Sequence, residues 1–271
     1  MLPELNLDGR TAIVTGAGRG IGRAISLVFA EAGADVVVAA RTASEIERTA
    51  GEIKALGGQS LAVPADVASS SEVDAMVDRA LDRFGKIDIL VNNAGQFSRT
   101  PVVPFPDAML KPPQVSRESI SRTTDEEWQA IIEANLTGVF YCCRAVAPSM
   151  IERRYGKIIN IGSNNATQAF PLVAAYNASK AGVNMLTRVL ALEWADYNIC
   201  VNAIGPGDYN TAMTAHTWDD TEMRKWHLDR IPLHREGDLR ELGVLATYLA
   251  SPASDYMTGQ LIYMDGGLTA Q

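Results

Sequence analysis

Short runs of β-branched and other apolar residues alternate with amphipathic stretches from one end of the chain to the other. This alternation is typical of parallel βα units rather than of separate all-helical and all-strand blocks. Several runs are apolar throughout, as expected of strands covered by helices on both faces. We therefore predict an α/β fold with one doubly wound, Rossmann-type parallel sheet. The predicted strands are Thr11–Thr15, Asp35–Ala40, Leu61–Ala65, Ile87–Asn92, Lys157–Ile161, Ile199–Ile204 and Leu261–Met264.

Amphipathic stretches between these strands predict the helices, and one of them has a clear start signal. Thr124 followed by Glu127 has the spacing of a capping box. No shift in composition divides the chain and no repeat occurs at solenoid periods, so we expect a single domain over residues 1–271. The predicted helices are Ile21–Ala32, Ser44–Leu56, Ser71–Phe84, Asp125–Arg153, Ala174–Ala195 and Asp238–Leu249.

Two connecting segments are far longer than the roughly 2–6 residues usual for a βα connection. Residues 96–123 are rich in proline, and residues 206–237 are rich in aromatic and methionine side chains. Long segments in compact domains are commonly lids or binding loops. We interpret 206–237 as a substrate-lid region, whereas 96–123 is expected either to line the substrate entrance or to cover a neighbouring subunit.

Charge and composition restrict the partners of the chain. Its 24 Lys and Arg residues against 32 Asp and Glu residues give a net charge of −8, and no basic stripe offers a surface for nucleic acid. The N-terminus does not read as a secretory signal, and no segment approaches the ~20 continuous apolar residues of a membrane span. We expect a cytoplasmic protein that binds neither nucleic acid nor membrane. Cys142, Cys143 and Cys200 have no disulfide or ligand spacing and are expected to be reduced core thiols.

A glycine-rich segment follows the first predicted strand and opens the first helix. Gly16, Gly20 and Gly22 are spaced as Gly-x-x-x-Gly-x-Gly, with Arg19 and Ile21 between them. Glycines there permit a tight turn and let backbone N–H groups approach a pyrophosphate at the positive end of the helix. Within a βαβ unit this pattern predicts a dinucleotide site.

The end of the second predicted strand bears on which dinucleotide is bound. A carboxylate there would bind the free ribose 2′-OH of NAD, but Arg41 follows the strand, and Glu45 falls into the next helix. A guanidinium pairs with a 2′-phosphate, and Arg19 would add a second positive charge. The sequence therefore favours NADP(H) over NAD(H). The alternative is that both arginines are solvated and NAD(H) binds without a carboxylate partner.

Tyr176 and Lys180 lie four residues apart in a predicted helix, so the phenol and the ammonium share one face. The unperturbed pKa of a phenol is about 10, and a nearby positive charge lowers it. Such a tyrosine is usable as both acid and base. The alternative is that Tyr176 and Lys180 are an ordinary pair on the surface of an amphipathic helix, which would have the same spacing.

Taken together, an ordered set of motifs over essentially the whole chain resembles the short-chain dehydrogenase/reductase family. Any one motif occurs by chance, but the ordered set at matching intervals does not. The set consists of Thr15-Gly16-Ala17-Gly18-Arg19-Gly20-Ile21-Gly22, Asp66-Val67, Asn92-Asn93-Ala94-Gly95, Asn135, Ser163, Tyr176 with Lys180, Gly205-Pro206-Gly207 with Thr211, and Asp265-Gly266-Gly267.

The resemblance implies four catalytic residues. Tyr176 would exchange a proton with the substrate oxygen, and Ser163 would hydrogen-bond that oxygen. Lys180 would lower the pKa of the phenol and hold the nicotinamide ribose. Asn135 would interrupt its helix and hold a water that connects Lys180 to solvent.

The resemblance also implies a set of nucleotide contacts. Asp66 and Val67 would meet the adenine edge, Asn93 would lie beneath the adenosine ribose, and the Ile204 backbone would meet the carboxamide. Local turn or capping roles remain the alternative for Asp66, Asn93 and Thr211. The full set of cofactor residues is Gly16, Arg19, Gly20, Ile21, Gly22, Arg41, Asp66, Val67, Asn93, Ala94, Gly95, Tyr176, Lys180, Ile204, Pro206, Gly207 and Thr211.

Departures from the family pattern bear on the substrate. Gly162 stands where a second serine is frequent, and Asn164 and Asn165 follow Ser163. These two amides suggest a substrate with polar substituents. The alternative is that Asn164 only hydrogen-bonds nearby backbone groups. His216 and His227 lack ligand spacing, so no metal site is predicted. The resemblance implies a homo-oligomer, a dimer or tetramer. The candidate substrate contacts are Gln96, Asn164, Asn165, Tyr209 and Met213.

These observations predict an oxidoreductase that transfers hydride between NADP(H) and a ketone or secondary alcohol. The direction is not readable from side chains. The alternative within enzymes is an NAD-dependent dehydrogenase of a sugar, polyol or sterol alcohol. Outside enzymes, a nicotinamide-binding sensor without turnover and an assembly role for residues 96–123 remain open.

Overall fold

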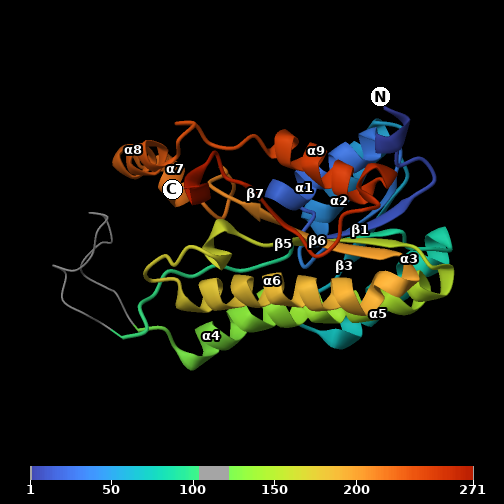
Figure 1. Cartoon of the computed structure of the whole chain (residues 1–271), viewed down its shortest axis with the longest axis horizontal. Helices are drawn as coiled ribbons and strands as arrows, with labels where there is room; N and C mark the ends of the chain where they lie inside the picture. Colours follow the sequence, from blue (N-terminus) through green and yellow to red (C-terminus); the bar gives the residue numbers. More distant parts are fainter. Residues whose placement is uncertain (1, 104–121, 271) are drawn as a thin grey trace.

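A single seven-stranded parallel sheet forms the centre of the protein (Figure 1). The computed structural model describes residues 2–103 and 122–270. Strand order is β3-β2-β1-β4-β5-β6-β7, which confirms the predicted doubly wound α/β fold. The strands are β1 Thr11–Thr15, β2 Asp35–Ala40, β3 Ser60–Pro64, β4 Ile89–Asn92, β5 Gly156–Ile161, β6 Ile199–Pro206 and β7 Leu261–Met264.

Helices cover both faces of this sheet (Figure 1). One face carries α1 (Gly20–Glu31), α2 (Ala43–Ala55) and α9 (Leu239–Ala250). The other carries α3 (Ser70–Phe84), α4 (Asp125–Ile132), α5 (Gly138–Arg153) and α6 (Ala174–Trp194). Two further helices, α7 (Ala215–Asp219) and α8 (Thr221–Arg230), lie beyond the end of the sheet near β7.

The strands are buried because successive side chains enter different cores. Val14 of β1 packs into the core beneath α1, α2 and α9, whereas Ile13 packs into the core beneath α3, α5 and α6. Val38 and Val37 of β2 divide in the same way. Two-sided burial of alternating residues explains why these strands are apolar throughout.

The order of the strands determines where a ligand binds. From β1, the chain moves to β2 and β3 on one side and then returns to β4 on the other. Adjacent loops after β1 and β4 therefore leave the sheet in opposite directions and open a crevice at the carboxyl ends of the strands. The glycine segment follows β1, and Asn93 follows β4, so both reach this crevice.

The predicted helix Asp125–Arg153 is interrupted. The capping box is confirmed, because Thr124 Oγ1 accepts from Glu127 N at 3.1 Å and the Glu127 carboxylate accepts from Thr124 N at 3.0 Å. One π-helical turn, Glu133–Thr137, then separates α4 from α5. This turn contains Asn135, which the sequence analysis expected to interrupt the helix.

The stretch Asp125–Arg153 is also long and apolar enough to cross a membrane by length and composition, with a mean hydropathy of 1.2. Half of its most apolar part is buried inside the protein. Val139, Val146 and Met150 belong to the core against the sheet. A buried core helix passes the same test, so the apolar composition is explained by packing within the fold.

Residues 206–237 are not an extended loop, contrary to our expectation, because α7 and α8 lie within them. Asp220 begins α8, and its carboxylate accepts from the backbone N–H groups of Glu222 and Met223 at 2.9 Å. Asp220 is a helix-start residue type, but α8 lacks the regularly spaced apolar residues that predict a helix from sequence.

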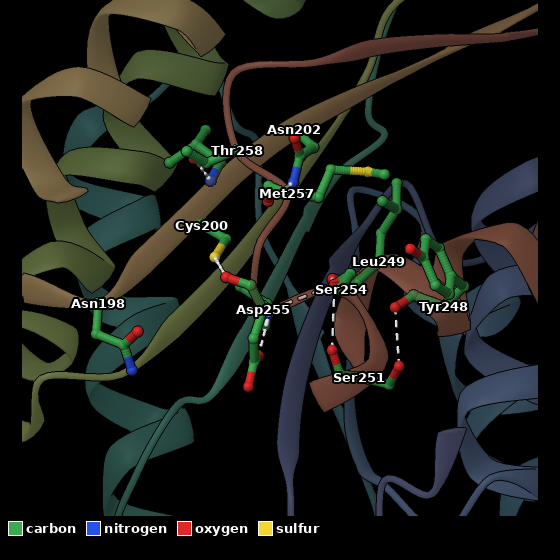
Figure 2. Close-up of polar contacts among 12 residues, drawn as sticks. Asn198, Cys200, Asn202, Tyr248, Leu249, Ser251, Ser254, Asp255, Met257 and Thr258 are labelled. Carbon is green, nitrogen blue, oxygen red and sulfur yellow. Dashed lines mark hydrogen bonds and ion pairs between the residues drawn. The ribbon is translucent and has the colours of Figure 1, made fainter. Parts of the chain in front are cut away.

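The connection from α9 to β7 is fastened to β6 by hydrogen bonds (Figure 2). Cys200 Sγ donates to the carbonyl oxygen of Asp255 at 3.6 Å, and Asn202 Nδ2 donates to that of Met257 at 2.8 Å. Thr258 Oγ1 accepts from Val201 N at 3.0 Å. These contacts fix the edge strand, so β7 lies rigidly beside the strand that leads into the site.

A buried carboxylate connects the start of β1 with the end of α5. Asp88 is fully buried and lies 2.8 Å from Arg153 Nη1, with Arg10 and Lys86 at 3.5 Å. Its other oxygen accepts from Thr11 N at 2.9 Å. The carboxylate therefore joins the start of β1 to the end of α5.

We expect Asp88→Asn to lower the free energy of unfolding by about 2–4 kcal/mol, because the substitution removes the buried negative charge that pairs with three partly exposed cations. Urea unfolding followed by circular dichroism measures this change. Glu31→Gln is the control, since its ion pair with Arg240 is exposed to solvent and should be worth less than about 1 kcal/mol. Equal losses for the two variants would contradict the assignment.

Candidate active site

The glycine segment forms a tight backbone cradle between β1 and α1. Gly16 and Gly20 have positive φ angles of 63° and 54°, which L side chains rarely adopt. A Cβ on Gly22 would lie 2.4 Å from the carbonyl oxygen of Gly16, so only glycine fits there. The amide of Asn93 donates to the carbonyl oxygens of Thr15 and Gly16 at 2.9 and 3.1 Å, which holds the cradle in place.

A cleft runs from this cradle to Tyr176 and Lys180. Its walls bring together residues from the ends of β1, β2, β3, β4, β5 and β6, as expected at a switch point of a parallel sheet. The predicted cofactor residues that line it are Gly16, Arg19, Gly20, Ile21, Arg41, Asp66, Val67, Asn93, Ala94, Gly95, Tyr176, Lys180, Pro206, Gly207 and Thr211.

Two predicted cofactor residues do not line the cleft. Gly22 packs beneath the cradle, against Gly16 and Asn93. Ile204 is fully buried, and its carbonyl oxygen accepts from Gly162 N at 2.7 Å, a contact between β6 and the end of β5. The geometry gives Gly22 a packing role, and the backbone carbonyl of Ile204 is already engaged within the sheet.

Carboxylates do reach the corner after β2, contrary to the sequence interpretation. Glu45 lies in the first turn of α2, lines the cleft, and places Oε1 3.3 Å from Arg19 Nη1. Asp66 lies 3.8 Å from Arg41 Nη1. The sequence showed no acidic residue at the end of the strand, but the helix that follows turns Glu45 back toward the glycine segment.

Tyr176 and Lys180 point into the same buried space. Lys180 is only 5% exposed, and its ammonium lies 5.6 Å from the centre of the Tyr176 ring. The ammonium donates to the carbonyl oxygen of Ile161 at 2.7 Å. Phe97 packs edge-on against Tyr176, with ring centres 5.2 Å apart. These contacts fix the phenol ring at the inner end of the cleft.

Burial moves both pKa values away from their ordinary positions. Burial raises the pKa of Tyr176, and a hydrogen bond with Ser163 lowers it by less. Burial also lowers the pKa of Lys180 to about 8. We expected Lys180 to lower the pKa of the phenol. In the chain itself the pKa is raised instead, because the loss of hydration outweighs the favourable contacts.

Ser163 is held in position by its neighbours. Its hydroxyl donates to Asn164 Oδ1 and accepts from Asn165 N, both at 3.1 Å. The serine is 6% exposed and lies on the wall of the cleft together with Tyr176. Asn164 therefore orients the serine hydroxyl, which is neither of the two roles that the sequence analysis considered for this amide.

The side chain of Asn135 connects the π-helical turn to the segment after β4. Its Oδ1 accepts from Gln96 N at 2.7 Å, and its Nδ2 donates to the Gln96 carbonyl oxygen at 2.9 Å. The same Nδ2 lies 3.2 Å from Ser179 Oγ. Asn135 is fully buried. The backbone at Gly95 lies between Asn135 and Lys180, because a Cβ built on Gly95 would lie 3.1 Å from Asn135 Oδ1 and 3.9 Å from Lys180 Nζ. Asn135 therefore fixes the segment after β4 beside Lys180.

A second pocket opens from the cleft at Ser163 and Tyr176. Residues of the lid region form one wall of this pocket, which gives residues 206–237 a place beside the reacting groups. The lid residues are Met213, Thr214, Thr217, Trp218, Trp226, His227 and Arg230, and the facing wall contains Phe97, Arg99, Phe170 and Val173.

A sequence model of the short-chain dehydrogenase family matches residues 10–222 of this chain. The chain belongs to the short-chain dehydrogenases. It is therefore a nicotinamide-dependent oxidoreductase that acts on CH–OH or C=O groups.

Relatives of this dehydrogenase have different substrates in their names. It is 40% identical to 3beta-hydroxysteroid dehydrogenase 1 of Eggerthella lenta, covering 97% of this chain and 95% of the relative. It is 39% identical to a 3-oxoacyl-[acyl-carrier-protein] reductase of Synechocystis, covering 97% and 98%. The crystal structure of a gluconate 5-dehydrogenase from Burkholderia cenocepacia in complex with NADP and tartrate superimposes with a TM-score of 0.89 at 38% identity, covering 99% and 98%.

The candidate substrate residues of the dehydrogenase divide into two groups. Asn164, Asn165 and Met213 line the second pocket. Gln96 lines the nucleotide cleft instead, and Tyr209 is 3% exposed with its hydroxyl donating to the Met264 carbonyl oxygen at 3.1 Å. The Tyr209 ring packs on Gly237, so the geometry supports a structural role for this residue rather than a substrate contact.

Sequence reasoning assigned no site role to three charged residues of the second pocket, Arg99, Asp208 and Arg230. Asp208 Oδ2 lies 3.0 Å from His227 Nδ1. Their position in the chain could have indicated a place near the site, because Arg99 follows Asn92-Asn93-Ala94-Gly95 closely and Asp208 follows the Pro-Gly turn. Of residues 96–123, positions 104–121 lie outside the described residues. Within the described part of the chain, no cluster of three potential metal ligands occurs.

Proposed function

We propose that this dehydrogenase reduces a ketone, or oxidises the corresponding secondary alcohol, with NADP(H). The observation that carries the proposal is the position of Ser163 and Tyr176 where the two cavities join, with the buried ammonium of Lys180 behind the phenol. A substrate oxygen at this junction lies within reach of two hydroxyl groups, while the remainder of the substrate occupies the second pocket.

The cleft fits a dinucleotide. Its glycine cradle allows a pyrophosphate to approach the backbone at the amino end of α1, where the helix dipole favours negative charge. Arg19 and Arg41 line the same cleft and would hold a 2′-phosphate. Asp66 and Asn93 remain proposed contacts of the adenosine half, since both line the same cleft as these arginines.

In the proposed reduction, the Ser163 hydroxyl rotates away from Asn164 Oδ1 and, together with the Tyr176 hydroxyl, donates to the substrate carbonyl oxygen. The bound nicotinamide supplies the hydride that adds to the carbonyl carbon. Tyr176 transfers its proton to the oxygen as negative charge develops there, and the positive charge of Lys180 stabilises the phenolate that remains. Oxidation of an alcohol uses the same groups in reverse.

The phenolate must recover a proton before the next turnover. Lys180 is the nearest proton donor on the inner side, and burial lowers the pKa of its ammonium to about 8, which makes proton release at neutral pH less costly than for an exposed lysine. Asn135 would complete the path by holding a water that leads from Lys180 to solvent.

A second candidate is an NAD-dependent dehydrogenase of a sugar, polyol or sterol alcohol. The position of Glu45 favours it, because this carboxylate lies in the cleft beside Arg19 and is able to accept from a ribose hydroxyl. The named activity of the Eggerthella relative, a hydroxysteroid dehydrogenase, is compatible with this alternative.

Cofactor preference separates the two candidates. With cyclohexanone, hydroxylated cyclohexanones and linear ketones as a panel, we expect kcat/KM for NADPH to exceed that for NADH. Arg41→Ala should lower the NADPH value by about 10-fold, because a charge-assisted contact with the 2′-phosphate is lost, and leave the NADH value nearly unchanged.

Arg79→Ala is the matched control, because Arg79 is an exposed residue of α3. The initial rate at which absorbance falls as NADPH or NADH is oxidised gives kcat/KM for each nucleotide. A preference for NADH that Arg41→Ala does not alter would favour the second candidate and remove Arg41 from the nucleotide site.

We further propose a cytoplasmic homo-oligomer, either dimer or tetramer. Large apolar side chains on α5 and α6, namely Phe140, Met185, Val189 and Leu192, are 41–82% exposed and would be covered by a second subunit. A monomeric sedimentation coefficient at micromolar concentration would contradict this part of the proposal.

A further inference from the structure

Arg99 lies on the wall of the second pocket, close to the catalytic helix. The next residue, Thr100, forms a parallel β-bridge with Val173, which immediately precedes α6 and lies three residues before Tyr176. Phe97, two residues before Arg99, packs against the Tyr176 ring. The backbone that carries Arg99 is therefore anchored on both sides to the segment that carries the proposed acid.

The guanidinium of Arg99 has no counter-ion among the residues that the structure describes. Its Nε is buried and has no hydrogen-bond partner there. Burial also lowers the pKa of this arginine, which shows that its positive charge is partly removed from water. A partly buried cation without a counter-ion carries a cost of desolvation, so the site favours a ligand that brings a negative charge.

Other groups of the pocket add to the positive charge. Arg230 stacks on Trp226 and Phe170, with its guanidinium carbon 4.4 and 5.1 Å from the ring centres. The one carboxylate among the described lining residues is Asp208, and it lies at hydrogen-bond distance from His227. The described lining of the pocket thus contains two arginines and one carboxylate, and Arg99 is the arginine on which the inference rests.

We propose that the substrate is a small oxo acid, or the matching hydroxy acid, whose carboxylate binds Arg99 while its carbonyl oxygen lies at Ser163 and Tyr176. This inference rests on the proposed function, because it uses the same reacting groups. The guanidinium forms two parallel hydrogen bonds with a carboxylate, which would fix the distance and direction of the carbonyl from the charged end.

The anion recognised by Arg99 is not a phosphate of the nucleotide. Arg19 and Arg41 line the nucleotide cleft at the glycine cradle, whereas Arg99 lines only the second pocket. The two pockets meet at Ser163 and Tyr176, so a ligand that contacts Arg99 is on the substrate side of the reacting groups. Phe97, Phe170 and Trp226 line the same pocket, and an apolar lining strengthens an ion pair by lowering the local dielectric constant.

Matched pairs of an acid and its methyl ester test the proposal, because each pair presents the same carbonyl with and without the charge. The probes are 4-oxocyclohexanecarboxylate and 5-oxohexanoate, each against its methyl ester, with NADPH. We expect the unsubstituted dehydrogenase to prefer the acids by at least about 10-fold in kcat/KM. Arg99→Gln should reduce kcat/KM for the acids by about 10- to 100-fold and for the esters by less than about 3-fold.

Arg99→Lys should restore part of the preference for acids, since the charge is retained without the paired geometry. Arg79→Gln, an exposed position on α3, is the control and should change neither value. Quenching of tryptophan fluorescence by cyclohexanecarboxylate and cyclohexanecarboxamide measures binding without turnover, and Arg99→Gln should weaken only the carboxylate.

Equal loss on acids and esters in Arg99→Gln would overturn the inference, because it would show a structural role. An unsubstituted enzyme that reduces or binds the acids no better than their neutral partners would overturn it too. Neither result removes the proposed function, because turnover of the neutral ketones with a nicotinamide nucleotide tests that function separately.

Discussion

Tyr176→Phe is expected to reduce kcat by about 10³-fold while the Kd for NADPH changes by less than about 3-fold. The substitution removes only the hydroxyl group that donates the proton. The aromatic ring remains, with its edge contact to Phe97 at 5.2 Å and the ammonium of Lys180 at 5.6 Å from its centre. Nucleotide affinity, measured by fluorescence titration, therefore separates loss of the acid from damage to the cleft.

Tyr197→Phe is the control for this prediction, because Tyr197 is 37% exposed and lies away from the cleft. We expect unchanged kcat for that variant. If Tyr176→Phe retained full kcat with normal nucleotide binding, the hydroxyl group would have no part in proton transfer, and the family assignment alone would not rescue the proposed mechanism.

Lys180→Met should also lower kcat by about 10³-fold, because the phenolate of Tyr176 loses the positive charge that stabilises it. The same substitution should stabilise the fold at neutral pH. Burial lowers the pKa of Lys180 to about 8, so the native state carries a desolvated ammonium whose cost methionine does not incur. The gain in unfolding free energy is expected to be about 1–3 kcal/mol, less the lost hydrogen bond to Ile161.

The pH dependence of this gain follows from proton binding. The unfolded chain keeps the Lys180 proton up to a pH of about 10.4, whereas the folded chain releases it near 8. Between these values the unfolded state binds more protons, so Lys180 makes stability rise with pH. The advantage of Lys180→Met is therefore largest below pH about 8 and disappears as the pH approaches about 10.4.

Thermal and urea unfolding across this range measure the difference between the two proteins. Lys54→Met on the exposed face of α2 is the control and should show no comparable gain. A Lys180→Met variant that is less stable at pH 7 and unchanged with pH would show that the lysine is bound by interactions stronger than its cost of burial.

Much of the fold was predictable because it rests on local periodicity and on two-sided burial. The bounds of Thr11–Thr15, Asp35–Ala40 and Leu261–Met264 agree with the predicted strands. The capping box was predictable because its two residues, Thr124 and Glu127, are only three positions apart in the sequence. Parallel order followed from the alternation of strands and helices, since each strand needs a crossover before the next.

What the sequence did not predict depends on contacts between distant segments. Glu45 meets Arg19 across 26 positions because α2 folds back over the cradle. The pKa of Tyr176 depends on how deeply its helix is buried, which the four-residue spacing to Lys180 does not reveal. The environment of Arg99 depends on the lid helices, whose apolar residues have no regular period.

The most direct test of the central claim is a titration of the Tyr176 phenol, followed by the ultraviolet difference spectrum of tyrosinate, with Tyr176→Phe subtracted. Burial raises the pKa of this group in the chain itself. The account predicts that NADP⁺ binding lowers the pKa of Tyr176 below that of an ordinary tyrosine, and that Lys180→Met abolishes this lowering. A phenol that titrates above the ordinary range with and without the nucleotide would contradict its role as the acid and base.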